Sequence, residues 1–174
     1  MSINLQGRIG IVKVSLYDEE MRLKYEETIR NLITTAGDQY YAQMGIAGVS
    51  PAAPAAPTKV NGMKLGTGTT AAAKSGAGGA LVTYLSGSNV VFDNTFPSAA
   101  AVGGDTGWDS IYQTTWPAGV ATNSAITEAV IVNDQATNAT TTAANTISRV
   151  TFTAVNKTAT DILIINWKHR GLGA

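Results

Sequence analysis

The sequence predicts a mainly β protein, with an antiparallel β-sandwich or jelly-roll-like body and an N-terminal arm that combines a hairpin and a helix. Two observations support the body. Short runs rich in β-branched and aromatic residues recur between turn signals, and apolar and polar residues alternate inside them. A third observation divides the chain, because the proline-rich stretch SPAAPAAPT separates this β-rich part from an N-terminal part of different composition.

The N-terminal arm is expected over residues 1–49. Alternating apolar side chains predict strands at residues 8–17 and 21–25, which an acidic turn joins into a hairpin. Apolar residues then recur at helical spacing over residues 29–44, which predicts an amphipathic helix with Thr28 as its N-cap.

A linker and the β body follow. Residues 50–58 carry three prolines at three-residue intervals, which favours an extended polyproline spacer, and residues 59–174 form the expected body. The body is predicted to contain strands at residues 89–96, 110–116, 125–132, 146–155 and 161–169. The side chains expected to face inward from the last three strands are Ala129, Ile131, Val150, Phe152, Leu163, Ile165 and Trp167.

The overall composition disfavours several classes of protein. Lys and Arg number 12 against 12 Asp and Glu, so the formal net charge of +0 argues against a nucleic-acid partner. The absence of Cys removes thiolate chemistry, and no apolar run approaches the ~20 residues that would span a bilayer. We therefore expect a soluble protein of the cytosol, without a membrane partner, whose low net charge suits a crowded assembly.

A glycine-rich segment, GTGTTAAAKS, is the strongest signal for catalysis. Gly68, Lys74 and Ser75 match a phosphate-binding loop, but Ala73 stands where the second glycine of that motif belongs. The segment continues into GAGGA, which is poor material for the helix that such a loop must open. A flexible Gly/Thr/Ala loop is the better interpretation, and a nucleotide-binding enzyme stays a distant alternative.

His169 is the only histidine, so no histidine pair is present to build a common metal site. It lies beside Lys168 and Arg170 near the end of a strand pattern, which favours a surface strand residue whose protonation the neighbouring cations oppose. No Ser or carboxylate stands at a spacing that would indicate a catalytic triad. We expect no catalytic residue, no metal and no cofactor.

Two kinds of residue invite a structural interpretation. Glu128 and Arg149 each lie in the middle of one of two consecutive predicted strands, so a cross-strand ion pair is expected. The tryptophans Trp108, Trp116 and Trp167 are candidate anchors for a partner, although tryptophans in a small β protein lie more often in the core, and Trp167 is the one predicted to do so.

A string of motifs between residues 63 and 168 resembles a family of tailed-phage virion proteins. Its members carry a Gly-Thr-Gly-Thr-Thr segment, a strand with Glu, a strand beginning with Arg, and a Lys before a final strand that ends near Trp. In this sequence those places are held by residues 66–70, Glu128, Arg149, Lys157 and Trp167. The last four are accordingly the residues expected to have structural roles, and none of these motifs is chemical.

The resemblance implies a structural virion protein and not an enzyme. The leading expectation is a capsid decoration, or cement, protein located on the virion, with the major capsid protein or other virion proteins and copies of itself, arranged as a homotrimer, as partners. The alternative is a tail, neck or baseplate component, because family members resemble both kinds of protein.

Overall fold

The computed structural model describes residues 8–50, 52–103 and 107–172. These residues form nine strands, one α-helix and two short 3-10 helices. The strands are β1 (Ile9–Tyr17), β2 (Leu23–Ile33), β3 (Gly62–Gly66), β4 (Val90–Val91), β5 (Ser98–Ala101), β6 (Gly107–Trp116), β7 (Asn123–Val132), β8 (Thr146–Lys157) and β9 (Ile162–Leu172). The helices are α1 (Thr35–Ile46), η1 (Gly76–Gly79) and η2 (Ala143–Asn145).

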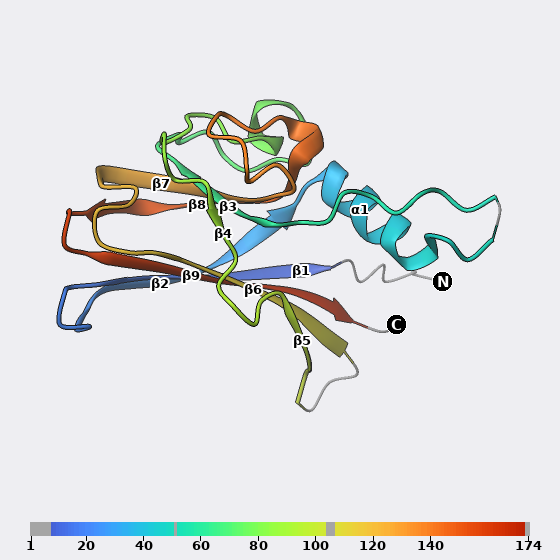
Figure 1. Cartoon of the computed structure of the whole chain (residues 1–174), viewed down its shortest axis with the longest axis horizontal. Coiled ribbons are helices and arrows are strands. Elements are labelled where there is room, and N and C mark those ends of the chain that lie inside the picture. Colours follow the sequence, from blue (N-terminus) through green and yellow to red (C-terminus); the bar gives the residue numbers. More distant parts are fainter. Residues whose placement is uncertain (1–7, 51, 104–106, 173–174) are drawn as a thin grey trace, which may run out of the picture.

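The nine strands form a single antiparallel sheet in the order β4-β3-β7-β8-β2-β1-β9-β6-β5. The sheet curls into two layers, with β3, β7 and β8 in one and β1, β9 and β6 in the other (Figure 1). Strand β2 joins them, because it pairs with β1 along its length and with β8 through Leu32 and Ile33. The mainly β prediction is therefore confirmed, whereas a sandwich of separate sheets or a jelly roll is not.

The curl also brings β4, the first strand in this order, back toward the layer that contains β6. The backbone N–H of Asp93, just after β4, donates to the Gln113 carbonyl of β6 at 2.9 Å. The Asp93 carboxylate in turn accepts from the N–H and the hydroxyl of Thr115. Strand β4 therefore keeps only two paired residues, and the strand predicted over residues 89–96 ends early because Asp93 turns toward β6.

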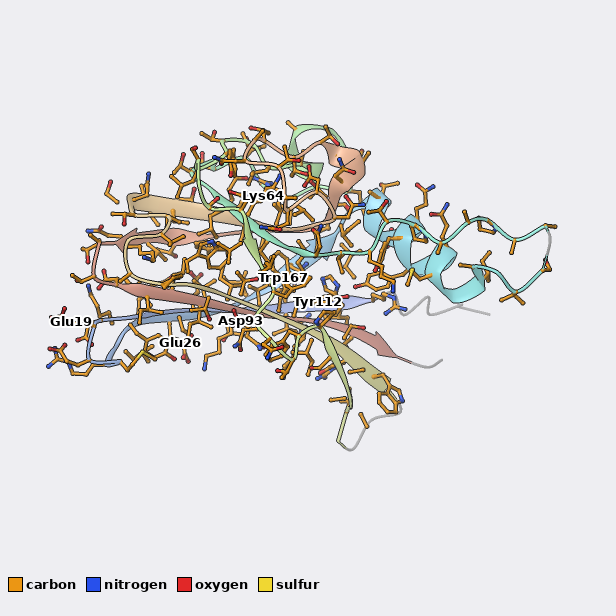
Figure 2. The ribbon with its side chains drawn as sticks, viewed as in Figure 1. Glu19, Glu26, Lys64, Asp93, Tyr112 and Trp167 are labelled. Carbon is orange, nitrogen blue, oxygen red and sulfur yellow. The ribbon has the colours of Figure 1, made fainter. Side chains whose placement is uncertain are left out.

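The hydrophobic core lies between the two layers. Figure 2 shows Trp167 and Tyr112 there, and burying each such side chain contributes about 1.5–3 kcal/mol. The side chains predicted to face inward from the last three strands all belong to this core: Ala129, Ile131, Val150, Phe152, Leu163, Ile165 and Trp167.

The N-terminal hairpin is an interior part of the same sheet, which corrects the expected division into an arm and a body. Strand β1 pairs with β9 over nine residue pairs, from Ile9 with Arg170 to Tyr17 with Ile162. Val12 and Val14 of β1 are completely buried. The alternation of β1 was recognised in the sequence, but the partner strand β9 lies more than a hundred residues away and no local pattern indicates that pairing.

The helix is shorter than predicted and begins later. Residues 29–33 continue β2, and the helix starts at Thr35 with Thr34, not Thr28, as its N-cap. The Thr34 hydroxyl accepts a hydrogen bond from the Gly37 N–H at 3.0 Å. Gly37 allows α1 to lie against β8, since a Cβ there would come within 2.1 Å of the Ile147 carbonyl oxygen.

Two long connections cover the outer face of the layer formed by β3, β7 and β8. They are residues 67–89, between β3 and β4, and residues 133–145, between β7 and β8, and both lie over that layer in Figure 1. Val130 and Val132 point into this cover and pack with Leu81. Strand β7 is therefore buried on both faces from Ile126 to Val132, although alternation of apolar and polar residues is typical of a strand with one buried and one solvated face.

Candidate functional site

The ion pair between Glu128 and Arg149 lies on the covered outer face of β7 and β8. Val130 is the register partner of Arg149, and Glu128 is two residues before Val130, so the two charged side chains are diagonal neighbours. The Arg149 Nε and Nη2 atoms donate to Glu128 Oε2 at 3.0 and 2.8 Å. Both side chains have 0% exposure, so the predicted cross-strand pair is present and completely buried.

The Glu128 carboxylate also holds the first long connection against the sheet. Its Oε1 atom accepts backbone N–H bonds from Gly68 at 3.0 Å, Val82 at 3.2 Å and Thr83 at 2.8 Å. Arg149 completes the contact from the other side, because its guanidinium donates to the carbonyl of Thr70 at 2.8 Å. A carboxylate that accepts several backbone N–H bonds keeps its charge satisfied without water.

The glycine-rich segment is therefore folded onto the sheet and is not a flexible loop. The Gly68 N–H, which would face a phosphate in a nucleotide-binding loop, donates instead to Glu128. Lys74, the lysine of that motif, forms a 2.6 Å ion pair with Asp38 at the start of α1. The sequence supplies the glycines because a Cβ on Gly66 or Gly68 would come within 2.5 Å of Glu128 Oε1.

A second ion pair, between the buried Lys64 and the partly buried Asp134, holds the other long connection. Lys64 of β3 has 0% exposure, lies 3.1 Å from Asp134, and donates to the Ala139 carbonyl at 3.1 Å. The Thr141 hydroxyl donates to the same Asp134 carboxylate at 2.8 Å. Figure 2 shows Lys64 beneath the connections that cover this layer. The only sign of this pair in the sequence is a lysine between Met63 and Leu65 in a strand-like run, and the pair was not predicted.

Lys157 and Trp167 lie away from these two ion pairs. The Lys157 ammonium is buried and donates to the Pro117 carbonyl at 3.0 Å, which fastens the end of β8 to the turn after β6. Burial lowers the pKa of Lys157, against the opposing charge of Asp161. Trp167 is completely buried in the core between the layers. Neither residue joins Glu128 and Arg149, so the structure places the four predicted residues in three separate environments.

His169 is completely buried, which corrects the expectation of a surface strand residue. Its Nε2 lies 3.0 Å from the Ser148 hydroxyl and its Nδ1 lies 2.5 Å from the Tyr41 hydroxyl. Burial, with the charge of Arg8 as a second cause, lowers the pKa of His169 to about 3. The cation that opposes protonation is thus Arg8, and not the sequence neighbours of the histidine.

The contact between Ser148 and His169 has the composition of a nucleophile and a base, but its surroundings oppose that use. Both residues have 0% exposure, and the Ser148 hydroxyl donates to the Leu32 carbonyl at 3.2 Å. Because the Ser148 hydroxyl donates its proton to a carbonyl, it does not donate that proton to the imidazole, as a nucleophile activated by a histidine base must. The pair instead links β8, β9 and the helix residue Tyr41.

The outer face of the other layer, formed by β1, β2 and β9, is open: no long connection between described residues lies over it in Figure 1, and it carries a groove of about 240 Å³. Two of its cations form ion pairs, Lys13 with Glu26 at 2.7 Å and Arg170 with Asp109 at 2.9 Å. The hydrogen bond from Arg170 is the main cause of a lowered pKa at Asp109. The residues that line the groove are Ile11, Lys13, Thr28, Asn166, Lys168 and Arg170.

Within residues 8–50, 52–103 and 107–172, no three His, Cys, Asp or Glu side chains gather closely enough to hold a metal ion. In the same part of the chain, no helix has the length and apolar character needed to cross a membrane. Comparison of the chain with protein-family models, with curated proteins and with solved structures gives no match. The described residues form a curled antiparallel sheet in which long connections cover the outer face of one layer and leave the outer face of the other open.

Proposed function

We propose that the protein is a structural component of a tailed-phage virion, and within that class a head decoration, or cement, protein. In this role it binds the outer face of the capsid shell and stabilises it. Its partners are the major capsid protein and other copies of itself. A homotrimer on a local threefold axis is the arrangement that the symmetry of an icosahedral shell favours.

One observation carries the proposal. The residues that bear the resemblance to virion proteins include residues 66–70, Glu128 and Arg149, which are far apart in the sequence. They meet in one buried cluster, where the carboxylate and the guanidinium both bind the chain's own backbone. A motif built this way maintains a rigid body, which supports a mechanical role over a chemical one.

The open face of the sheet is the surface we assign to the capsid shell. It spans several strands side by side, and its groove combines the apolar side chain of Ile11 with the cations of Lys13, Lys168 and Arg170. Non-obligate protein–protein interfaces have this mixed polar and apolar character. Such a contact needs about 1,000 Å² of buried surface, which one side of a multi-stranded sheet can supply.

The N-terminal hairpin is not the segment that pairs with a neighbouring subunit in this mechanism, since β1 and β2 already pair inside the chain's own sheet. The formal net charge of +0 is consistent with a contact outside the shell, because a protein that packs DNA inside needs cations for the phosphates. Stabilisation of the shell then comes from surface buried across the junctions between capsid subunits.

Antibody labelling of purified virions, imaged by electron microscopy, tests the proposal, with an antibody against a tail protein as the control. We expect label over the head of the particle. Label on the tail, neck or baseplate would support the alternative structural component instead. Absence of the protein from purified virions, checked by mass spectrometry, would contradict both.

A further inference from the structure

Strand β5 is an open edge of the sheet. It consists of Ser98–Ala101, it is the last strand in the strand order, and its one partner in that order is β6. All four of its residues are exposed. An edge strand of this kind presents unpaired N–H and C=O groups along its free side, and these groups can pair with another strand.

The edge is protected only by its short length and by Pro97 just before it, and it carries no charged residue or bulge. Soluble proteins commonly protect an edge with a lysine, an internal proline or a bulge. Strand β5 has only one serine and three alanines, and its register against β6 is regular from Ser98 with Ile111 to Ala101 with Trp108. The other end of the strand order, β4, differs because residues next to it already bind β6.

Trp108 lies beside this edge and is the one exposed tryptophan of the three. It is 63% exposed, whereas Trp116 and Trp167 are completely buried. Residues alternate between the faces of β6, so Trp108 lies on the same face as Tyr112, which belongs to the core. Figure 1 shows β5 and the start of β6 lying away from β3, β7 and β8, so the core-side face continues there without a covering layer.

We propose that two copies of the chain pair through their β5 edges, antiparallel and about a twofold axis, with Trp108 of each copy lying over the alanines at the seam. A second copy is the occupant we assign, because self-pairing of this edge carries no charge penalty. Strand β5 carries no charge, so placing it against itself brings no like charges together. Antiparallel pairing of identical strands is self-complementary, as a twofold contact requires.

The contact is expected to be weak for the free protein, because a seam of four residues forms only a few hydrogen bonds. The β5 contact becomes stronger where another contact already holds two copies side by side, because pairing then takes place within one assembly. The inference concerns the isolated protein and does not depend on the proposed location on a virion.

Sedimentation equilibrium of the full chain over a wide range of concentration tests the pairing. The wild-type protein should show a monomer–dimer equilibrium. Ala99→Lys and Ala99→Glu should each weaken it several-fold by placing like charges at the seam, and mixing the two variants should restore association. Ala154→Lys, at an exposed position of β8, is the matched control and should associate like the wild type.

Quenching of tryptophan fluorescence by acrylamide supplies a second measurement. The accessible component should shrink as the wild-type concentration rises, and Trp108→Phe should abolish that component, because the other two tryptophans are buried. A wild-type protein that stays monomeric at every concentration would overturn the proposal. Association that Ala99→Lys and Ala99→Glu leave unchanged would overturn it equally, since the seam would then lie elsewhere.

Discussion

The Arg149 guanidinium donates two hydrogen bonds to one oxygen of the Glu128 carboxylate, at 2.8 and 3.0 Å, and both side chains have 0% exposure. The other oxygen of Glu128 accepts the N–H groups of the connection that covers the sheet. The pair therefore joins β7, β8 and residues 67–83 into one unit, and the stability of the covered face should depend on it.

Removing one member of this pair should destabilise the protein more than removing both. Arg149→Met leaves the Glu128 carboxylate buried without its counter-charge, which should cost about 3–5 kcal/mol in the free energy of unfolding. The double variant Glu128→Gln with Arg149→Met should recover part of that loss. Urea unfolding of the two single variants and the double variant measures the coupling.

The exposed ion pair between Lys74 and Asp38 is the control for this cycle, because both side chains are more than half exposed. Solvent screens such a pair, so Lys74→Met should have little effect. Strictly additive effects at Glu128 and Arg149 would mean that the two side chains do not interact in solution.

Gly68→Ala should destabilise the protein by about 1–3 kcal/mol, because the added Cβ would lie 2.5 Å from Glu128 Oε1 and 2.7 Å from the Val82 Cβ. Gly45→Ala is the matched substitution in open space, with nothing within 4 Å of its Cβ. It lies in α1 and should stabilise the protein by up to about 1 kcal/mol. Thermal unfolding compares the two variants, and equal effects would show that residues 67–83 are not held as described.

The protein should become less stable as the pH decreases, because His169 can then be protonated in the unfolded chain. Burial lowers the pKa of His169 to about 3 in the folded state, whereas the unfolded side chain titrates near its ordinary value of 6.5. Between these two pKa values the unfolded state binds more protons than the folded state. The contribution of neutral His169 to stability is therefore complete above the unfolded pKa and is lost as the pH decreases toward the folded pKa. The expected loss is about 1.4 kcal/mol per pH unit within that window.

His169→Gln should remove this slope, because an amide can still bond to Ser148 and Tyr41 but does not titrate. Urea unfolding of both proteins at about pH 7, 6 and 5 provides the measurement. Parallel pH profiles for the variant and the wild type would indicate that His169 is accessible to protons in the folded state.

A chain that begins at Thr58 should fail to fold cooperatively. It lacks β1 and β2, so β8 and β9 lose the strands that join them, and the core loses Val12, Val14 and Leu16. Far-ultraviolet circular dichroism with tryptophan fluorescence during heating reports the outcome. A cooperative transition close to that of the full chain would restore the view of residues 1–49 as a separate arm.

Local alternation in the sequence was sufficient to predict β1, β6, β7, β8 and β9, which supply much of the core, but not β3 with its core residues Met63 and Leu65. It placed Ile165 and Trp167 correctly, and because strands β7 and β8 are consecutive it also paired Glu128 with Arg149. It missed β5, since the sequence Ser-Ala-Ala-Ala has low β propensity and acquires its conformation from β6. The ion pair between Lys64 and Asp134 was missed because seventy residues separate the two side chains.

The sequence assigned the N-terminal hairpin to a separate arm, whereas the hairpin lies inside the sheet. The reason for this difference is physical. The prolines after residue 50 do mark a connection, but such a marker does not show which strands the preceding hairpin contacts. The extended part of β2 was assigned to the helix because Ile29, Leu32 and Ile33 fit helical spacing as well as they fit a strand. Pairing with β1 and β8 decided in favour of the strand.

The central claim, that the protein binds a capsid shell through its open sheet face, is tested most directly by cosedimentation with shells that lack it. We predict saturable binding at a stoichiometry fixed by the shell symmetry, weakened several-fold by Lys168→Glu in the groove and unchanged by Ala154→Glu on another strand. Wild-type protein that stays in the supernatant, with shells confirmed intact by electron microscopy, would contradict the account.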